Sequence, residues 1–125
     1  MKKQRPINLN LSTIYFPLTA VTSILHRISG IITFFSIGAL LWLLGLSLSS
    51  PTNFLHACAI IDNFYFKFIA WVLVNTLFFH FIGGIRHLIM DFEIIRTTVD
   101  TGNISSKLVL GSTILFVIVS GVFIW

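Results

Sequence analysis

The stretch Ile28–Leu48, ISGIITFFSIGALLWLLGLSL, contains no charged residue, and the next charge in the chain is Asp62. A helix needs about 20 predominantly apolar residues to cross a hydrocarbon core of roughly 30 Å. The stretch is long enough to do so, and it ends at the polar, helix-breaking run Ser49, Ser50 and Pro51. We therefore predict a membrane-spanning helix at about residues 23–48.

Two further apolar stretches, at about 64–90 and 108–125, are also long enough to span a bilayer. The chain is 56% hydrophobic and only 10% charged, with a mean hydropathy of +0.97. A soluble globular domain carries about 25% charged residues. The sequence therefore predicts an all-α integral membrane protein with three transmembrane helices, and we expect residues 1–125 to form a single transmembrane domain.

Residues 1–22 are polar and are interrupted by Pro6 and Pro17, so we expect a cytoplasmic arm and no fourth span or signal peptide. With this arm inside the cell, the inner side holds seven of the eight lysines and arginines, and the outer side holds only Lys67. Such a bias follows the positive-inside rule. It predicts a cytoplasmic N-terminus and a periplasmic C-terminus.

The net charge of +4 does not indicate a partner in nucleic acid, because the cations are scattered among apolar runs that face membrane lipid. The single cysteine, Cys58, excludes a disulfide within the chain, a zinc cluster of thiolates and a covalently attached haem. Any cofactor would therefore depend on histidines and on the few other polar groups near the spans.

His80 is the histidine that lies deepest in a predicted span, 13 residues after Lys67 and 7 before His87. Ionisable residues inside a membrane are costly unless they are paired or ligated. Gly83 and Gly84 follow one turn later, and glycine would allow a flat macrocycle to approach the helix while the imidazole binds its iron. The alternative is a histidine that bonds a neighbouring helix, with the glycines serving close packing. Spacing alone leaves both open.

A second polar group shares one face of the first predicted helix, because residues at i, i+3, i+4 and i+7 lie together. Its members are Ser23, His26, Arg27 and Gly30. A hydroxyl and a guanidinium at the inner rim of the bilayer could hold a quinone carbonyl or haem propionates. The alternative is an arginine that snorkels to lipid phosphates and serves only as a topological anchor.

A third group, Arg86, His87 and Asp91, lies at the end of the second predicted helix. It could bind a propionate or handle protons, but its spacing is equally that of an ordinary helix end with an i, i+4 pair. On spacing alone, the ordinary helix end is favoured.

Two motifs in this order resemble the cytochrome b556 subunit family of succinate dehydrogenases. The motifs are Ser23-x-x-His26-Arg27-x-Ser29-Gly30 and His80-x-x-x-Gly84-x-Arg86-His87-x-x-x-Asp91. The basic arm Lys2-Lys3-Gln4-Arg5-Pro6 is similar too, whereas the outer loop and the third span match only in hydrophobicity.

The resemblance implies a subunit of succinate dehydrogenase in the bacterial inner membrane. His80 would be one axial ligand of haem b, and a second small membrane anchor subunit would supply the other. Ser23 and Arg27 would line a ubiquinone site, with His26, Arg27 and His87 near the haem propionates. Electrons from succinate would pass from a flavoprotein subunit through an iron–sulfur subunit to ubiquinone, and this chain would not act on succinate itself.

Three other functions remain open at this point. A fumarate reductase anchor would run the same chemistry in reverse with a lower-potential quinone. A small transporter usually buries an acidic residue for coupling, but all four acidic residues here fall outside the predicted spans. The last alternative is a membrane anchor with no redox site.

Overall fold

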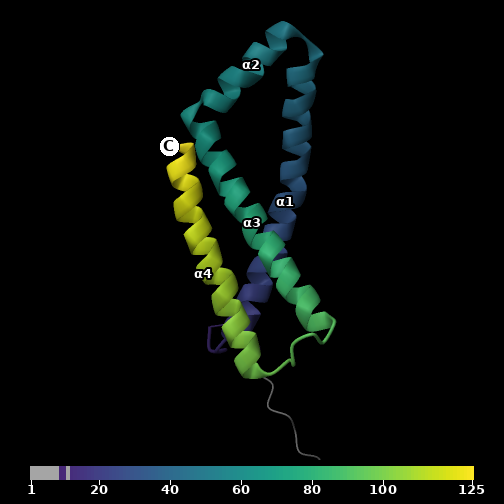
Figure 1. The fold of residues 1–125 in the computed structure, drawn as a ribbon, viewed down its shortest axis with the longest axis vertical. Helices are drawn as coiled ribbons and strands as arrows, with labels where there is room; N and C mark the ends of the chain where they lie inside the picture. The colour runs from purple at the N-terminus through teal and green to yellow at the C-terminus, as the bar shows by residue number, and fades with distance from the viewer. Residues whose placement is uncertain (1–8, 11) are drawn as a thin grey trace, which may run out of the picture.

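The computed structural model describes residues 9–10 and 12–125, and these form four α-helices and no strand. The helices are α1 (Leu18–Ser49), α2 (Pro51–Asp62), α3 (Phe64–Asp91) and α4 (Val99–Ile124) (Figure 1). In length and composition, α1, α3 and α4 can each cross a membrane. The predicted all-α membrane fold with three spans is thus confirmed. The whole basic arm, Lys2-Lys3-Gln4-Arg5-Pro6, lies outside the described residues.

The short helix α2 occupies the segment that we expected to be an outer loop. It begins where Ser50 accepts a hydrogen bond from the backbone N–H of Asn53 at 3.1 Å, with Pro51 at the first helical position. Serine at the N-cap followed by proline is a strong helix-start signal. From the sequence, we predict only that these two residues end the preceding span. The same serine–proline step therefore both ends α1 and starts α2.

Two spans start earlier than we predicted. Helix α1 begins at Leu18, directly after the extended Pro17, so the N-terminal arm is shorter than residues 1–22. Helix α4 begins at Val99, nine residues before the apolar run, because Thr98 and Thr101 form a capping box there. Asp100 in the first turn also suits the positive end of the helix dipole. A helix starts at its cap, which need not coincide with the edge of its apolar run.

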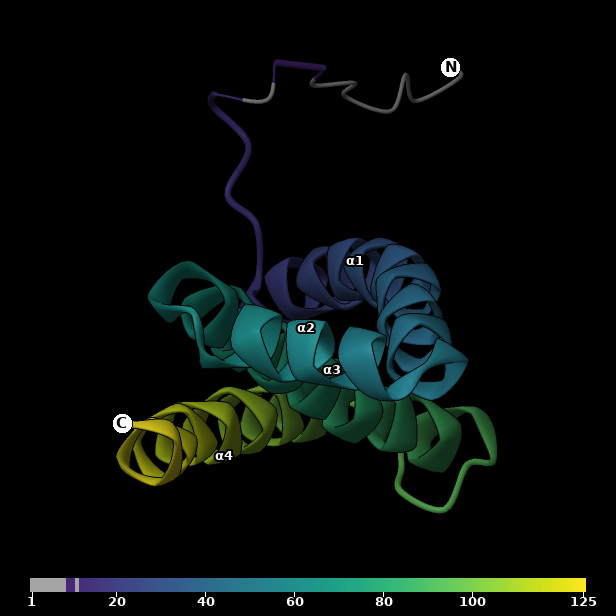
Figure 2. The same cartoon turned by 90° about the horizontal axis from the view of Figure 1, so that it is seen from above.

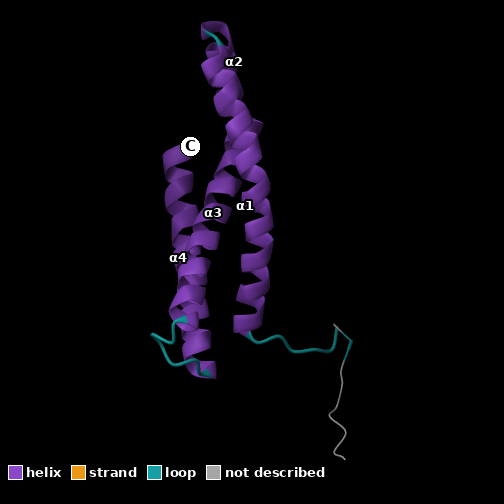
Figure 3. Cartoon of the chain, turned by 90° about the vertical axis from the view of Figure 1, so that its right-hand side faces the viewer, coloured by secondary structure: helices purple, strands orange, loops and turns teal. Residues whose placement is uncertain are grey.

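Helices α1 and α3 cross in one half of the molecule and diverge in the other half, where α2 joins them (Figure 1). Seen from above, α3 lies between α1 and α4 (Figure 2). The start of α1 and the α3–α4 loop lie at one end, and α2 forms the other (Figure 3). Near the α2 end, the Phe64 and Trp125 rings lie 5.0 Å apart.

Buried and exposed side chains are distributed opposite to the pattern of a soluble protein. The fully buried side chains of the described part are small and hydroxylated, Thr22 and Ser106, whereas large apolar residues such as Phe34 and Leu48 are more than 70% exposed. Small residues at helix interfaces are typical of transmembrane packing, where lipid solvates the apolar exterior. The exterior of this chain is suited to lipid and to other membrane subunits.

Candidate functional site

Two glycines allow α1 and α3 to approach closely where they cross. A Cβ added at Gly30 would lie 3.0 Å from Cε1 of His80, and one added at Gly83 would lie 2.7 Å from Cδ2 of His26. Each helix thus presents a glycine to the imidazole of the other. We had expected Gly83 to open a surface beside His80 on its own helix, but its space is taken by His26.

The imidazoles of His26 and His80 are stacked between the two helices. Their centroids are 4.3 Å apart and their planes differ by 5°. Nε2 of His26 lies 3.1 Å from the backbone carbonyl oxygen of His80, which can only accept a hydrogen bond. The crossing thus brings His26 to the level of His80, the histidine that the sequence places deepest in a span.

The two ring nitrogens of His80 have different surroundings. Nδ1 lies 3.1 Å from Oγ of Ser29 and 3.3 Å from the carbonyl oxygen of His26. No described residue forms a hydrogen bond with Nε2. In the described part, the buried side-chain polar atoms without a partner are the hydroxyls of Thr33 and Ser106. Nε2 of His80 is not among them, so this nitrogen is not fully buried by the described residues.

Ser23 and Arg27 lie on the α1 side of the crossing, Ser23 three residues before His26 and Arg27 directly after it. The Ser23 side chain is half-buried and that of Arg27 is exposed. Neither side chain forms a hydrogen bond or ion pair with the residues that the structure describes. Both therefore keep their donors available to a molecule outside this chain, as a binding role requires.

The group Arg86, His87 and Asp91 does not form a cluster. His87 contacts the crossing, where its ring centroid is 4.9 Å from that of His26. Arg86 is 7% exposed and points to α4, where Nε donates to Oγ of Ser105 at 3.0 Å. Asp91 is exposed. Of the three, only His87 lies beside the other predicted site residues, so the structure does not bring the group together as one propionate or proton-handling cluster.

Hydrogen bonds between polar side chains link α3 to α4, and the sequence did not lead us to predict them. The indole N–H of Trp71 donates to Oγ of Ser120 at 3.0 Å, Ser120 donates to Oδ1 of Asn75 at 3.1 Å, and Asn75 donates back to the Trp71 carbonyl at 2.7 Å. Asn75 and Ser120 are each 8% exposed. Asparagine in an apolar span was the available signal, because buried polar groups need partners.

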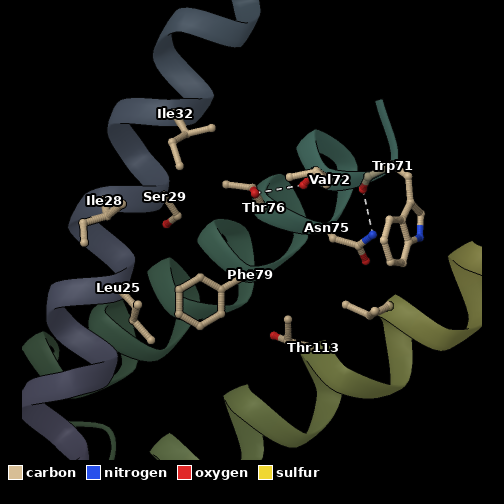
Figure 4. Close-up of a pocket in the computed structure, with 11 residues that line it drawn as sticks. Leu25, Ile28, Ser29, Ile32, Trp71, Val72, Asn75, Thr76, Phe79 and Thr113 are labelled. Carbon is tan, nitrogen blue, oxygen red and sulfur yellow. Dashed lines mark hydrogen bonds between the residues drawn. The ribbon is translucent and has the colours of Figure 1, made fainter. Parts of the chain in front are cut away.

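A mainly apolar cavity of about 340 Å³ lies beside this network. Ser29 and Ile32 line it from α1, Asn75 and Phe79 from α3, and Thr113 from α4 (Figure 4). The cavity therefore joins the α1–α3 crossing to the α3–α4 interface. No cluster of three metal-binding side chains occurs among the described residues.

Comparison with known proteins places the chain in a family. Residues 1–120 match the model of the succinate dehydrogenase/fumarate reductase transmembrane subunit. The succinate dehydrogenase cytochrome b556 subunit of Coxiella burnetii is 34% identical over the full length of both chains. That of Paracoccus denitrificans is 29% identical over 95% of this chain and 92% of its own. That of Rickettsia conorii is 38% identical over 70% of this chain and 68% of its own.

The three apolar spans and the bacterial relatives identify a multi-pass protein of the bacterial inner membrane. The match to the family model covers nearly the whole chain, and the full-length relative agrees with it. The chain belongs to the succinate dehydrogenase/fumarate reductase transmembrane subunit family.

Proposed function

We propose that this chain anchors a succinate:ubiquinone oxidoreductase in the membrane, where it binds haem b and ubiquinone. The observation that carries the proposal is the His80 imidazole, whose Nδ1 faces two oxygens while Nε2 is not fully buried and has no partner among the described residues. Metal-bound histidines typically hold one ring nitrogen in a hydrogen bond and coordinate through the other. The donor set at the crossing therefore suits a haem iron.

We assign one axial ligand, His80, to this chain, because Nε2 of His26 is already directed at a backbone carbonyl. The second ligand would come from another small membrane subunit, so the haem would be shared. His87, next to His26, and the exposed Arg27 could bind the propionates together with His26. When bound, haem b supplies one-electron redox chemistry.

Ser23 and Arg27 are proposed to bind a ubiquinone carbonyl. That oxygen gains negative charge as the quinone is reduced, and fixed donors in a region of low dielectric stabilise the developing charge. Electrons would reach this site from succinate through a flavoprotein subunit and an iron–sulfur subunit. Succinate itself would be oxidised by those partners, outside the membrane.

The proposed orientation has the N-terminus in the cytoplasm. The start of α1, the end of α3 and the start of α4 lie at one end of the molecule (Figure 1). The described cations Arg86, Arg96 and Lys107 belong to that end. This arrangement supports an inner, positively charged side, on which the water-soluble partner subunits would bind.

The haem proposal is tested by difference spectra, reduced minus oxidised, of the complete complex. His80→Leu should abolish the b-type bands because it removes the imidazole that we assign to the iron. His26→Phe, which keeps an aromatic ring in the stack, should retain them, as should His87→Leu. Unchanged bands in His80→Leu, with loss in His26→Phe or His87→Leu, would refute the assignment.

The quinone proposal is tested by two activities of the same membranes. Ser23→Ala and Arg27→Leu should each slow ubiquinone reduction by about a hundredfold, the usual effect of losing one such donor. Succinate oxidation with a soluble dye, which accepts electrons upstream, should persist. Ser36→Ala is the control, because Ser36 is exposed on the same helix and bonds only its own backbone. Loss of both activities, or of neither, would contradict the proposal.

A further inference from the structure

Ser29 is the buried polar residue closest to the proposed iron ligand. Its side chain is 4% exposed. Oγ donates to the carbonyl oxygen of His26 at 2.7 Å and lies 3.1 Å from Nδ1 of His80. The hydroxyl thus joins the backbone of α1 to the imidazole of α3.

These contacts determine where the proton on His80 resides. A serine hydroxyl has one proton to donate, and the short bond to the His26 carbonyl uses it. Oγ of Ser29 can then only accept from His80. The second neighbour of Nδ1 is the same carbonyl oxygen, at 3.3 Å, which also only accepts. Both contacts are satisfied when Nδ1 carries the proton, and Nε2 is then left with a free lone pair.

We propose that Ser29 is a positioning residue for His80: its hydroxyl holds the proton on Nδ1 and keeps the Nε2 lone pair directed out of the chain toward a metal. This inference rests on the proposed function and specifies how the ligand is prepared before the metal arrives. It assigns a role to a motif serine for which the sequence alone suggested none.

The surroundings of the ring support this assignment. The stacked His26 covers one face of the His80 ring, and a Cβ at Gly30 would press on Cε1 at 3.0 Å. These contacts restrict the position of the ring plane, but neither distinguishes one nitrogen from the other. The hydrogen bond to Ser29 is the contact that does so. An outer partner of this kind both fixes the tautomer of a ligating histidine and raises its basicity.

The test compares Ser29→Ala with Ser47→Ala in the complete complex. Ser47 is the matched control, because it lies on the same helix and donates at 2.8 Å to the carbonyl three residues earlier, as Ser29 does. We expect Ser29→Ala to weaken haem retention by about 10- to 100-fold, the usual effect of losing an outer partner. The haem that remains should have a higher midpoint potential, because a less basic imidazole stabilises oxidised iron less. Ser47→Ala should match the wild type.

Ser29→Thr, which keeps the hydroxyl, should restore the wild-type potential. The ratio of haem to flavin in intact complex separates this role from a merely structural one. A lower yield of Ser29→Ala complex with unchanged haem ratio and unchanged potential would overturn the inference, as would an unaffected complex. If the b-type spectrum survives His80→Leu, the proposed function fails first and this inference fails with it.

Discussion

The α1–α3 crossing and the α3–α4 interface both bury polar side chains, but they use them differently. At the α3–α4 interface, Trp71, Asn75 and Ser120 satisfy one another in a closed network. At the crossing, Nδ1 of His80 is held by hydrogen bonds, whereas Nε2 has no partner among the residues that the structure describes. A network in which every polar side chain has a partner stabilises the packing of two helices. A histidine that is bonded through one ring nitrogen only is prepared to bind a ligand through the other.

Arg86 is another polar side chain that forms its hydrogen bonds across the α3–α4 interface. It bonds Ser105 and the carbonyl of Gly102 on α4, at 3.0 and 3.5 Å, and pairs with no carboxylate in the described part of the chain. Its guanidinium thereby joins the end of α3 to the start of α4, where Gly102 lies close to Thr19 of α1. Arg86, one of the seven cations predicted to lie on the inner side, therefore also links α3 to α4 by hydrogen bonds.

The largest effect in this comparison is expected from Gly83→Ala at the crossing. The added Cβ would lie 2.7 Å from the His26 ring, and relieving such a clash typically costs about 1–3 kcal/mol. We expect a lower thermal midpoint together with an altered haem spectrum, because the stacked rings must move. Calorimetry and difference spectra of the same complex would measure both.

Gly111→Ala is the control for this substitution, because a Cβ there meets nothing within 4 Å. Alanine also favours a helix over glycine by up to about 1 kcal/mol, so the control should be neutral or slightly stabilising. If both variants behave alike, the close approach at Gly83 does not support the site.

A smaller effect is expected from Asn75→Leu at the α3–α4 interface. It removes one hydrogen-bond partner of Ser120 on the neighbouring helix, and hydrogen bonds between helices in membranes contribute about 0.6 kcal/mol on average. We expect a slightly lower thermal midpoint with an unchanged haem spectrum. Thr76→Val is the control, since Thr76 bonds only the Val72 carbonyl of its own helix. A changed spectrum in Asn75→Leu alone would mean that this interface also shapes the site.

The number of spans could be predicted from the sequence because it depends on local properties, the length and polarity of apolar runs. The helix α2 and the early start of α4 were missed because their signals are single capping residues, Ser50 and Thr98, outside those runs. Capping acts through a few backbone hydrogen bonds, so hydropathy does not register it.

The site was predicted only in part, for a similar reason. Sequence singled out His80 by its depth in a span, but depth along one helix does not say which residue of another helix lies beside it. The partnership of His26 with His80, and the role inferred for Ser29, depend on where α1 and α3 cross. That position is set by Gly30 and Gly83, 53 residues apart in the chain.

The most direct test of the account replaces the His80 side chain with free imidazole. In the complete complex, His80→Gly should lose the b-type spectrum, and added imidazole should restore it by occupying the vacated coordination position. Imidazole should not alter the spectrum of His26→Gly, because that ring bonds a backbone carbonyl and not the metal. Restoration in His26→Gly but not in His80→Gly would contradict the claim that the crossing presents His80 to the haem.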